Sequence, residues 1–467
     1  MKNSVCRYDA GMRELLEAIN QDPAGIAFIV DDSGKLCGVV TDGDFRRMLL
    51  GGKSLEENLS RTDLGEFVSA KRGQSLDDLL KITNKKVRII PIVNENGEPV
   101  DYFRYEHKTH FTPVAEPSLS SKELHYLTDA FLSTWISSRG KYIDQFEQGF
   151  SAFIGCGHGV STANGTVAIH LALEALGIGK GDEVIVPDLT FAATINAVIH
   201  TGATPVIVDI DRQRWTIDPG EIRKAITPKT KAIIPVHIYG QPCEMDEIMT
   251  ISREKNIYVV EDCAEAQGAM YRGQKVGSFG HISTFSFFAN KILTTGEGGM
   301  CVTNSAELDV RMRVLRDHGM NKEKRYWHDV VGYNYRMTNL QAAIGCAQLE
   351  RAKELIDARK AIELEYRSQL KHLKIEWQKD FNDSSRVVWL VCVSVDGDRD
   401  ELLKQLQANQ VDCRPFFYPL SSMPLYRNYI FSNKNSIEAG ARGLNLPTVG
   451  RVNFDKIRLV FDRFLNG

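Results

Sequence analysis

Short apolar segments alternate with helical patterns between residues 121 and 345. An example of the helical pattern is Val167–Leu176. Strands that alternate with helices predict an α/β domain with a largely parallel sheet. The expected strands are Glu183–Pro187, Pro205–Ile210, Ala232–Val236, Ile257–Val260 and Ser283–Phe287.

The composition of the chain is that of an ordinary globular protein. Its 467 residues carry 57 basic and 60 acidic side chains, a net charge of −3, which argues against nucleic acid as a partner. No apolar stretch reaches the ~18 residues of a membrane span, and no secretory signal is visible. The nine scattered cysteines form no C-x-x-C pair. They predict reduced thiols in a cytoplasmic protein without a metal site.

The region before the α/β pattern contains an internal repeat. Ala27–Val40 resembles Ile90–Phe103, and each copy is a strand, a turn with glycine and a second strand. The repeat predicts a small pseudo-symmetric α+β domain over residues 1–107. A lapse in pattern, with prolines and polar residues, predicts a linker over 108–120.

A smaller α+β lobe is expected at the C-terminal end. A long helix over Leu340–Leu370 precedes a strand at Val387–Val395 and helices at Asp400–Asn409 and Asp455–Phe464. These patterns predict a large domain over 121–360 and a small domain over 361–467.

Three features of the α/β region are candidates for chemistry. Lys291 follows an apolar strand, and partial burial there can lower the pKa of a lysine and free its amine for Schiff-base chemistry. Asp262 ends a buried strand, where a carboxylate can keep a pyridine nitrogen protonated. The turn at Asn164 and Gly165 begins a helix whose N–H groups can bind phosphate. Taken singly, each also fits a structural role, namely a surface lysine, a helix cap or an ordinary turn.

Together these features resemble the fold-type I enzymes that use pyridoxal 5′-phosphate (PLP). Residues 121–467 resemble the DegT/StrS family of nucleotide-sugar aminotransferases more closely. The motifs that carry the resemblance are Asn164–Thr166, Glu261–Asp262, Ser286–Lys291, Gly296–Gly299, Gly332–Thr338 and Gly443–Pro447. The resemblance implies an aspartate aminotransferase-like fold with a small C-terminal lobe, and PLP as the cofactor.

The resemblance also implies site residues. Lys291 would form the Schiff base and shuttle protons, and Asp262 would pair with the pyridine nitrogen. Glu265 would pack on the ring, where family members often carry His or Gln. The remaining implied cofactor contacts are Phe191 near the ring, Gly165, Thr166 and Ser286 on the phosphate, and Asn334 on the phosphate of a neighbouring subunit. Related 3-dehydratases carry His in place of Lys291, so the lysine favours amino transfer in a homodimer or larger assembly with a shared site.

Two segments, Thr134–Tyr142 and Arg414–Pro419, resemble those that frame the substrate in the GDP-perosamine synthases of this family. The implied substrate-binding residues are Trp135, Ser137, Ser138, His328, Arg414, Phe416 and Tyr418. The implied reaction moves an amino group from L-glutamate to a nucleotide-linked 4-keto-6-deoxy sugar for surface polysaccharide. A UDP- or dTDP-linked sugar, a keto-sugar acid and a non-catalytic nucleotide sensor stay open as alternatives.

The N-terminal region resembles a pair of cystathionine-β-synthase-type (CBS) domains, through the stretch Gly38–Arg47. The resemblance implies that Thr41 and Asp44 hold the ribose and phosphate of an adenine nucleotide. The alternative is a structural or dimerising module that binds nothing, since a fold alone does not establish a function.

Overall fold

The computed structural model divides the chain into two units, Met1–His110 and Phe111–Gly467, and each is described by itself. The structure describes residues 4–22, 24–60, 63–65, 67–74, 78, 79, 82, 89–104, 111–321 and 323–466. The expected boundary at residue 107 and the first three residues of the expected linker lie outside this described part.

The first unit builds the same three-stranded motif twice. The strands are β1 (Val5–Arg7), β2 (Ile26–Val30), β3 (Leu36–Thr41), β4 (Ala70–Lys71), β5 (Ile89–Val93) and β6 (Pro99–Arg104). In each copy the first two strands are parallel and the last two antiparallel. A register shift between Ile29 and Val30 recurs between Ile92 and Val93. The repeat expected from the sequence therefore extends to the backbone irregularities.

Two amphipathic helices, α1 (Met12–Gln21) and α2 (Asp42–Leu50), complete the first copy. Both hairpin turns place a glycine at positive φ, Gly34 at 82° and Gly97 at 83°. The two turns meet, because the Leu36 N–H donates to the Gly97 carbonyl at 2.9 Å. The two copies thus pack into one small domain.

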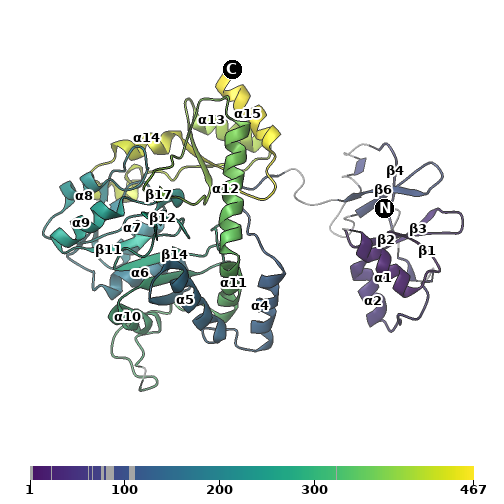
Figure 1. Cartoon of the computed structure of the whole chain (residues 1–467), viewed down its shortest axis with the longest axis horizontal. Helices are drawn as coiled ribbons and strands as arrows, with labels where there is room; N and C mark the ends of the chain where they lie inside the picture. The colour runs from purple at the N-terminus through teal and green to yellow at the C-terminus, as the bar shows by residue number, and fades with distance from the viewer. Residues whose placement is uncertain are drawn as a thin grey trace. The chain divides into compact units, whose positions relative to one another are not determined.

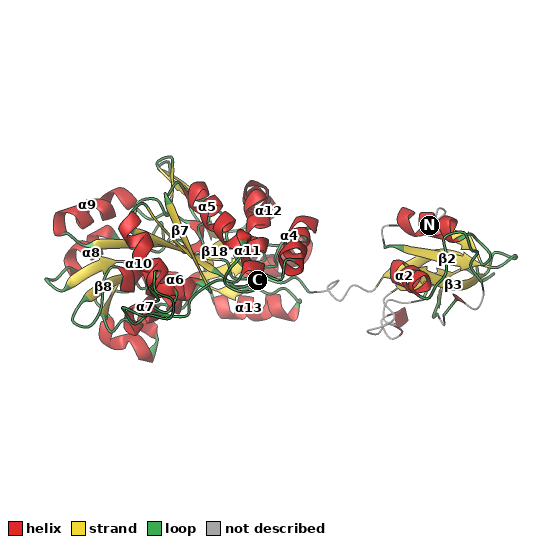
Figure 2. Cartoon of the chain, turned by 90° about the horizontal axis from the view of Figure 1, so that it is seen from below, coloured by secondary structure: helices red, strands yellow, loops and turns green. Residues whose placement is uncertain are grey.

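A seven-stranded sheet forms the centre of the second unit (Figures 1 and 2). The order of its strands is β7-β15-β14-β11-β10-β8-β9. Its strands are β7 (His158–Thr162), β8 (Glu183–Pro187), β9 (Thr204–Val208), β10 (Thr230–Ile233), β11 (Tyr258–Asp262), β14 (Ile282–Ser286) and β15 (Gly299–Thr303). Neighbours are parallel except at β15, which is antiparallel to both β14 and β7. The strands are apolar and mostly buried, as a covered parallel sheet requires. The expected α/β fold is confirmed.

Helices cover this sheet and extend from it. They are α4 (Ser121–Leu132), α5 (Lys141–Ile154), α6 (Gly165–Ala175), α7 (Ala192–His200), α8 (Pro219–Ala225), α9 (Met245–Lys255), α10 (Ala306–Arg316) and α11 (Asn339–Glu350). Of these, α6 is buried along most of its length and packs on β14 and β15. A separate small sheet pairs β12 (Met270–Tyr271) and β13 (Gln274–Lys275), which lie between β11 and β14 in the sequence, with β17 (Ser384–Ser385), which follows α12 (Ala352–Gln369). Among the described residues, no helix is long and apolar enough to cross a membrane.

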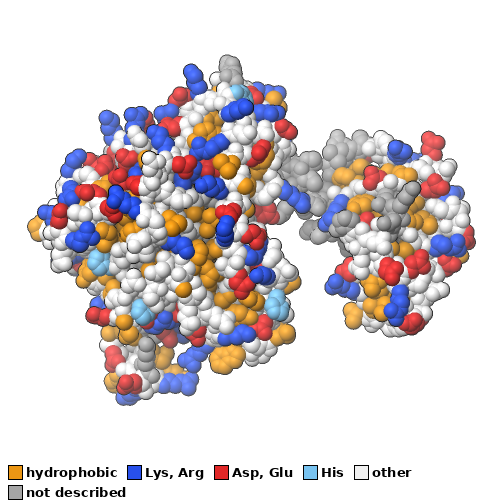
Figure 3. Space-filling view, viewed as in Figure 1, with side chains coloured by type: hydrophobic (Ala, Val, Ile, Leu, Met, Phe, Trp, Pro, Cys, Tyr) orange, Lys and Arg blue, Asp and Glu red, His pale blue; other side chains and the backbone are white. Residues whose placement is uncertain are grey.

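The C-terminal lobe has its own antiparallel sheet and core. Its strands, in sheet order, are β16 (Ile375–Trp377), β18 (Val391–Val395), β20 (Gly443–Leu446) and β19 (Arg414–Pro415). Its helices are α12 (Ala352–Gln369), α13 (Arg399–Ala408), α14 (Lys434–Arg442) and α15 (Phe454–Asn466). Side chains such as Val393, Leu402, Leu444 and Phe461 are fully buried between them. On the face shown in Figure 3, basic and acidic side chains intermingle over the second unit.

Two expected elements differ from the structure. The single helix expected over Leu340–Leu370 is divided between α11 and α12, because Arg351 leaves helical geometry at φ −101° and ψ 7°. The strand expected from Val387 begins only at Val391. The residues before it belong to a loop in which the Val387 N–H bonds to the Gly240 carbonyl instead of to a neighbouring strand.

Candidate active site

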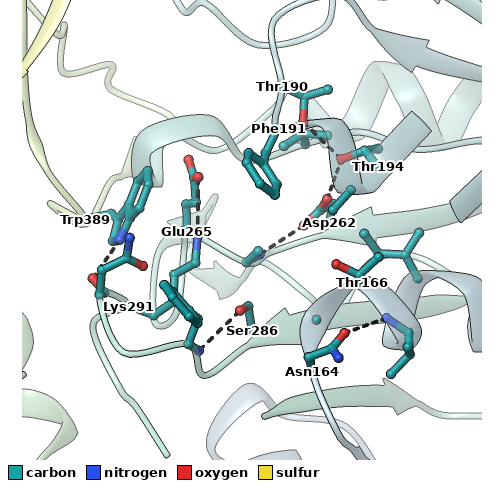
Figure 4. A pocket seen from close by; sticks show the side chains of 18 of the residues that line it. Asn164, Thr166, Thr190, Phe191, Thr194, Asp262, Glu265, Ser286, Lys291 and Trp389 are labelled. Carbon is teal, nitrogen blue, oxygen red and sulfur yellow. Dashed lines mark hydrogen bonds and ion pairs between the residues drawn. The ribbon is translucent and has the colours of Figure 1, made fainter. Parts of the chain in front are cut away.

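A cavity of about 560 Å³ lies where β11 and β14 end (Figure 4). Ligands of open α/β sheets bind at this carboxyl edge. Seven of the residues predicted to bind the cofactor line it: Gly165, Thr166, Phe191, Asp262, Glu265, Ser286 and Lys291. The fold therefore brings together side chains that are far apart in sequence.

Asp262 is the last residue of β11 and is buried. Its Oδ2 accepts a hydrogen bond from Thr194 Oγ1 at 2.9 Å, and its Oδ1 accepts one from the Ala264 N–H at 3.1 Å. Burial raises the pKa of Asp262, and these two hydrogen bonds oppose that rise. The carboxyl group is thus fixed in orientation and lines the cavity, where it can pair with a cation.

Lys291 lies in the turn after β14, with 12% of its side chain exposed. Its Nζ is 3.4 Å from Glu265 Oε1 and 4.1 Å from the centre of the Trp389 ring (Figure 4). Arg359 Nη2 donates to the Lys291 carbonyl at 3.1 Å, and Trp389 Nε1 donates to the Asn290 carbonyl at 2.9 Å. The amine is therefore held at the cavity wall between a carboxylate and an aromatic face.

Glu265 is the second buried carboxyl group of the cavity. Burial raises its pKa to about 7, although Lys291 and the Tyr239 N–H both oppose the rise. That N–H donates to Glu265 Oε2 at 2.8 Å. The raised pKa of Glu265 was not predictable from the residue type, because the sequence alone shows neither the burial of this side chain nor its hydrogen-bond partner.

The start of α6 provides a cradle for an anion. Asn164 caps the helix by accepting the Val167 N–H at 3.0 Å, and the first N–H groups of a helix have no acceptor within it. These groups, with the helix dipole, attract phosphate. A Cβ on Gly165 would lie 2.8 Å from Ser286 Cβ, so glycine lets the end of β14 approach the helix. Thr166 and the Ser286 hydroxyl complete the polar wall.

The other predicted residues lie outside this cavity. Asn334 is exposed and its Oδ1 accepts a hydrogen bond from Arg336 at 3.2 Å. The predicted substrate residues are exposed or half-buried in the chain, except for Phe416. They are Trp135, Ser137, Ser138, His328, Arg414 and Tyr418.

Phe416 requires a correction. Its ring is fully buried against Trp215 and Tyr239, so it is part of the core and cannot contact a ligand there. The next residue, Phe417, lines the cavity instead. In an irregular segment the sequence does not show which of two adjacent aromatics faces inward.

Sequence analysis missed several lining residues. Thr190 and Thr194 support Asp262 from the start of α7, with their hydroxyls 3.0 Å apart. Trp389 and Phe417 reach the cavity from the C-terminal lobe. The four-residue spacing of the threonines was a usable signal, whereas the two aromatics are placed only by the tertiary fold.

A buried cluster of His237, Glu261 and Cys263 lies behind β11. His237 Nδ1 accepts the Cys243 N–H at 3.0 Å, so its Nε2 carries the proton and donates to Glu261 at 3.0 Å. Glu261 also accepts the N–H groups of residues 277, 279 and 280. These hydrogen bonds use both ring nitrogens of His237 and both carboxylate oxygens of Glu261, and they anchor the strand that carries Asp262.

The predicted nucleotide-binding pair of the first unit has a structural role of its own. Thr41 Oγ1 accepts the Asp44 N–H at 3.2 Å, and Asp44 Oδ2 accepts the Thr41 N–H at 2.9 Å. This is a capping box that starts α2. Asp44 also pairs with Arg47.

Comparison with known proteins agrees with this geometry. The sequence model of the DegT/DnrJ/EryC1/StrS aminotransferase family matches residues 117–465, and that of the CBS domain matches residues 2–51. A GDP-perosamine synthase from Escherichia coli O157:H7 is 44% identical over 349 residues, covering 74% of this chain and 96% of that protein. A UDP-N-acetyl-3-dehydro-alpha-D-glucosamine 3-aminotransferase from Acidithiobacillus ferrooxidans is 46% identical over 254 residues, which cover 54% of this chain and 67% of that protein.

Among solved structures, Spr1654 from Streptococcus pneumoniae in its PLP form has a TM-score of 0.72 at 27% identity, covering 76% of this chain and 98% of that one. The cavity itself fits PLP. Lys291 offers an amine for the aldehyde, and Asp262 offers a carboxylate for the ring nitrogen. The start of α6, which Gly165 lets approach Ser286, offers N–H groups for the phosphate. The chain is a PLP-dependent sugar aminotransferase, and it belongs to the DegT/DnrJ/EryC1/StrS aminotransferase family.

Proposed function

We propose that this enzyme transfers an amino group from L-glutamate to a GDP-linked 4-keto-6-deoxy sugar, to supply an amino sugar for surface polysaccharide. The observation that carries the proposal is the 44% identity to a GDP-perosamine synthase across 96% of that protein. We place the reaction in the cytoplasm, where the nine free cysteines of the chain would stay reduced.

Each lining residue has a task in this proposal. PLP, when bound, supplies an electron-withdrawing ring that stabilises negative charge on the carbon that loses a proton. Lys291 would hold the cofactor through its Nζ and would move a proton with the same atom during the reaction. Asp262, oriented by Thr194, keeps the ring nitrogen protonated. Gly165, Thr166 and Ser286 would hold the phosphate and Phe191 would contact the ring, since all four line the cavity.

The charges of the cavity favour a shared site in a homodimer or larger assembly. Among its lining residues, all of them described, Lys291 is the one basic side chain, against three acidic ones. A phosphate and a nucleotide diphosphate need further hydrogen-bond donors and cations beyond this lysine. We propose that a neighbouring subunit contributes Asn334 to the phosphate. It would also bring exposed segments that carry Trp135, Ser137, Ser138 and His328, while Arg414 and Tyr418 bind the substrate from the C-terminal lobe.

The test is an amination assay with a panel of sugar nucleotides. Purified protein with PLP and L-glutamate is given GDP-, UDP- and dTDP-linked 4-keto-6-deoxy sugars, and products are identified by mass spectrometry. We expect amination of the GDP-linked sugar and none by Lys291→Ala. Turnover of another nucleotide sugar in preference would contradict the proposal.

The second candidate substrate is a UDP-linked 3-keto sugar. It is favoured by the 46% identity to the enzyme from Acidithiobacillus ferrooxidans, although that match covers 54% of this chain. Including that sugar in the panel separates the two candidates. A non-catalytic sensor is not favoured, because Lys291, Asp262 and the phosphate cradle are all in place.

Binding of an adenine nucleotide at Thr41 and Asp44 stays a prediction. A ligand bound only by the folded state must raise the unfolding temperature. We expect a rise on adding adenine nucleotides that is lost in Thr41→Val. An unchanged unfolding temperature would favour a structural role for the first unit.

A further inference from the structure

Arg359 is a buried cation that has no carboxylate partner. It lies on α12, and 8% of the residue is exposed. Within the described part of the chain it forms no ion pair, and Glu363, one helical turn further along, already pairs with Arg367 and Arg386. Burial lowers the pKa of Arg359 to about 10, so the side chain stays charged near neutral pH. A charge buried in this way is costly unless hydrogen bonds compensate for the lost water.

The hydrogen bonds of Arg359 go to backbone carbonyl groups. Its Nη1 donates to the Trp389 carbonyl, and its Nη2 donates to the carbonyls of Lys291 at 3.1 Å and Asn290 at 3.5 Å. Trp389 Nε1 closes the connection by donating to the same Asn290 carbonyl at 2.9 Å. One guanidinium group thus joins α12, the turn after β14 that carries Lys291 (the lysine turn) and the loop before β18.

The loop before β18 places an aromatic ring beside the reactive amine. The Val387 N–H fixes the start of this loop by donating to the Gly240 carbonyl at 3.2 Å. The Trp389 ring is buried and stacks on Tyr239 with 8° between the ring planes. The centre of this ring lies 4.1 Å from Lys291 Nζ (Figure 4). The same guanidinium group therefore supports both the lysine turn and the ring that packs against its amine.

We propose that Arg359 is a positioning residue for amino transfer, which holds the Lys291 amine in reach of the reacting atoms by bridging the carbonyls of Lys291 and Trp389. Arginine suits this task because its planar fork of N–H donors can join two segments at fixed angles, whereas the lysine ammonium is a single point of charge. Rigid support matters, because a displacement of about 1 Å caused far from the chemistry can slow a reaction about 100-fold.

The alternative is that Arg359 only ties the C-terminal lobe to the large domain. Such a tie would change the free energy of unfolding and leave the turnover of the folded protein unchanged. A positioning role instead slows the steps that Lys291 carries out in protein that is folded and binds glutamate normally. The inference rests on the role proposed above for Lys291, but not on which sugar is the substrate.

The test is the single-turnover rate at which L-glutamate bleaches the visible band of the PLP-loaded, full-length enzyme. We expect the maximal rate to fall about 100-fold in Arg359→Met, which has no donors, and in Arg359→Lys, which keeps the charge but not the fork. The glutamate concentration that gives half of this rate should change less than about twofold. The control is Arg367→Met on the same helix, because Arg367 bonds to Glu363 and to the Gln378 carbonyl and not to the lysine turn. A wild-type rate in Arg359→Met, or full rescue by Arg359→Lys, would overturn the inference.

Trp389→Phe tests the same connection without removing a buried charge. It keeps a ring beside Lys291 but loses the Nε1 donor to the Asn290 carbonyl, so we expect bleaching to slow about tenfold. Because both substitutions release the lysine turn, combining Trp389→Phe with Arg359→Met should slow bleaching less than about twofold beyond Arg359→Met alone. A wild-type rate in Trp389→Phe, or a combined loss equal to the product of the two separate losses, would overturn the inference.

A readout without turnover is the circular dichroism of the cofactor band, which depends on how the protein orients the bound ring. We expect the signal per bound PLP to fall in Arg359→Met and to stay at the wild-type level in Arg367→Met. Equal signals in both variants would contradict a positioning role. If Lys291→Ala stays active, the role proposed for Lys291 is wrong. If Lys291→Ala is inactive while Arg359→Met bleaches at the wild-type rate, the inference about Arg359 alone is wrong.

Discussion

Glu265→Gln should change how the stability of the protein depends on pH. The pKa of this carboxyl group rises from an ordinary 4.5 to about 7 in the folded protein. Such a rise corresponds to about 3 kcal/mol, because each pKa unit represents about 1.4 kcal/mol. The group is buried, so solvent screening reduces this little. Glutamine has nearly the same shape but no charge to desolvate.

The sign follows from where the proton is held more tightly. The folded state keeps the Glu265 proton up to about pH 7, whereas the unfolded state loses it near pH 4.5. The wild type therefore loses stability as pH rises through this window and stays less stable above it. Between pH 5 and pH 8.5, the free energy of unfolding of the wild type should fall by about 2.5 kcal/mol relative to that of Glu265→Gln.

The assay is urea unfolding followed by tryptophan fluorescence. All five tryptophans lie in the second unit, so the signal reports on the aminotransferase part alone. We expect the free energy of unfolding of Glu265→Gln, relative to that of the wild type, to increase by about 2.5 kcal/mol from pH 5 to pH 8.5. The control is Glu297→Gln, an exposed carboxyl group on the same cavity, which should follow the wild type. Parallel curves for Glu265→Gln and wild type would refute the reasoning.

Two further predictions concern the support of the cofactor. Gly165→Ala places a methyl group where it would lie 2.8 Å from Ser286 Cβ, so we expect PLP affinity, measured by absorbance titration, to fall about tenfold. Gly450→Ala, which has open space around it, is the control, and equal affinity in both variants would contradict the cradle. Thr194→Val removes the 2.9 Å hydrogen bond to Asp262 and should lower kcat/KM by about tenfold. Wild-type kinetics there would show that Asp262 needs no such support.

Much of the fold was predictable because its signals are local. The apolar strands and the residues at their carboxyl ends, including Asp262, follow from periodicity and from the rules of parallel sheets. The break at Arg351 was not predictable, because the helical sequence pattern continues through this residue although the backbone leaves helical geometry there. In the site, the motifs include several of the residues that line the cavity, among them Gly165, Asp262 and Lys291.

The part of the cavity wall that comes from the C-terminal lobe was harder to predict because it depends on tertiary structure. Trp389 and Phe417 come from a separate lobe. Phe417 lies in the predicted segment Arg414–Pro419, whereas nothing near Trp389 in sequence marks it as a lining residue. Phe416, which the resemblance implies as a substrate residue, is buried in the core while Phe417 lines the cavity, because an irregular segment has no periodicity to assign a face. Residues such as Asn334, which are exposed in one chain, depend on a neighbouring subunit for any role in the site.

The central claim is that Lys291 and PLP carry an amino group from glutamate to a GDP-linked keto sugar. The most direct test is the visible absorbance of the PLP-loaded enzyme as the two substrates are added in turn. We predict a cofactor band that L-glutamate bleaches and the GDP-linked 4-keto-6-deoxy sugar restores, with neither change in Lys291→Ala. A band that glutamate leaves unchanged, or that the GDP-linked sugar does not restore, would contradict the account.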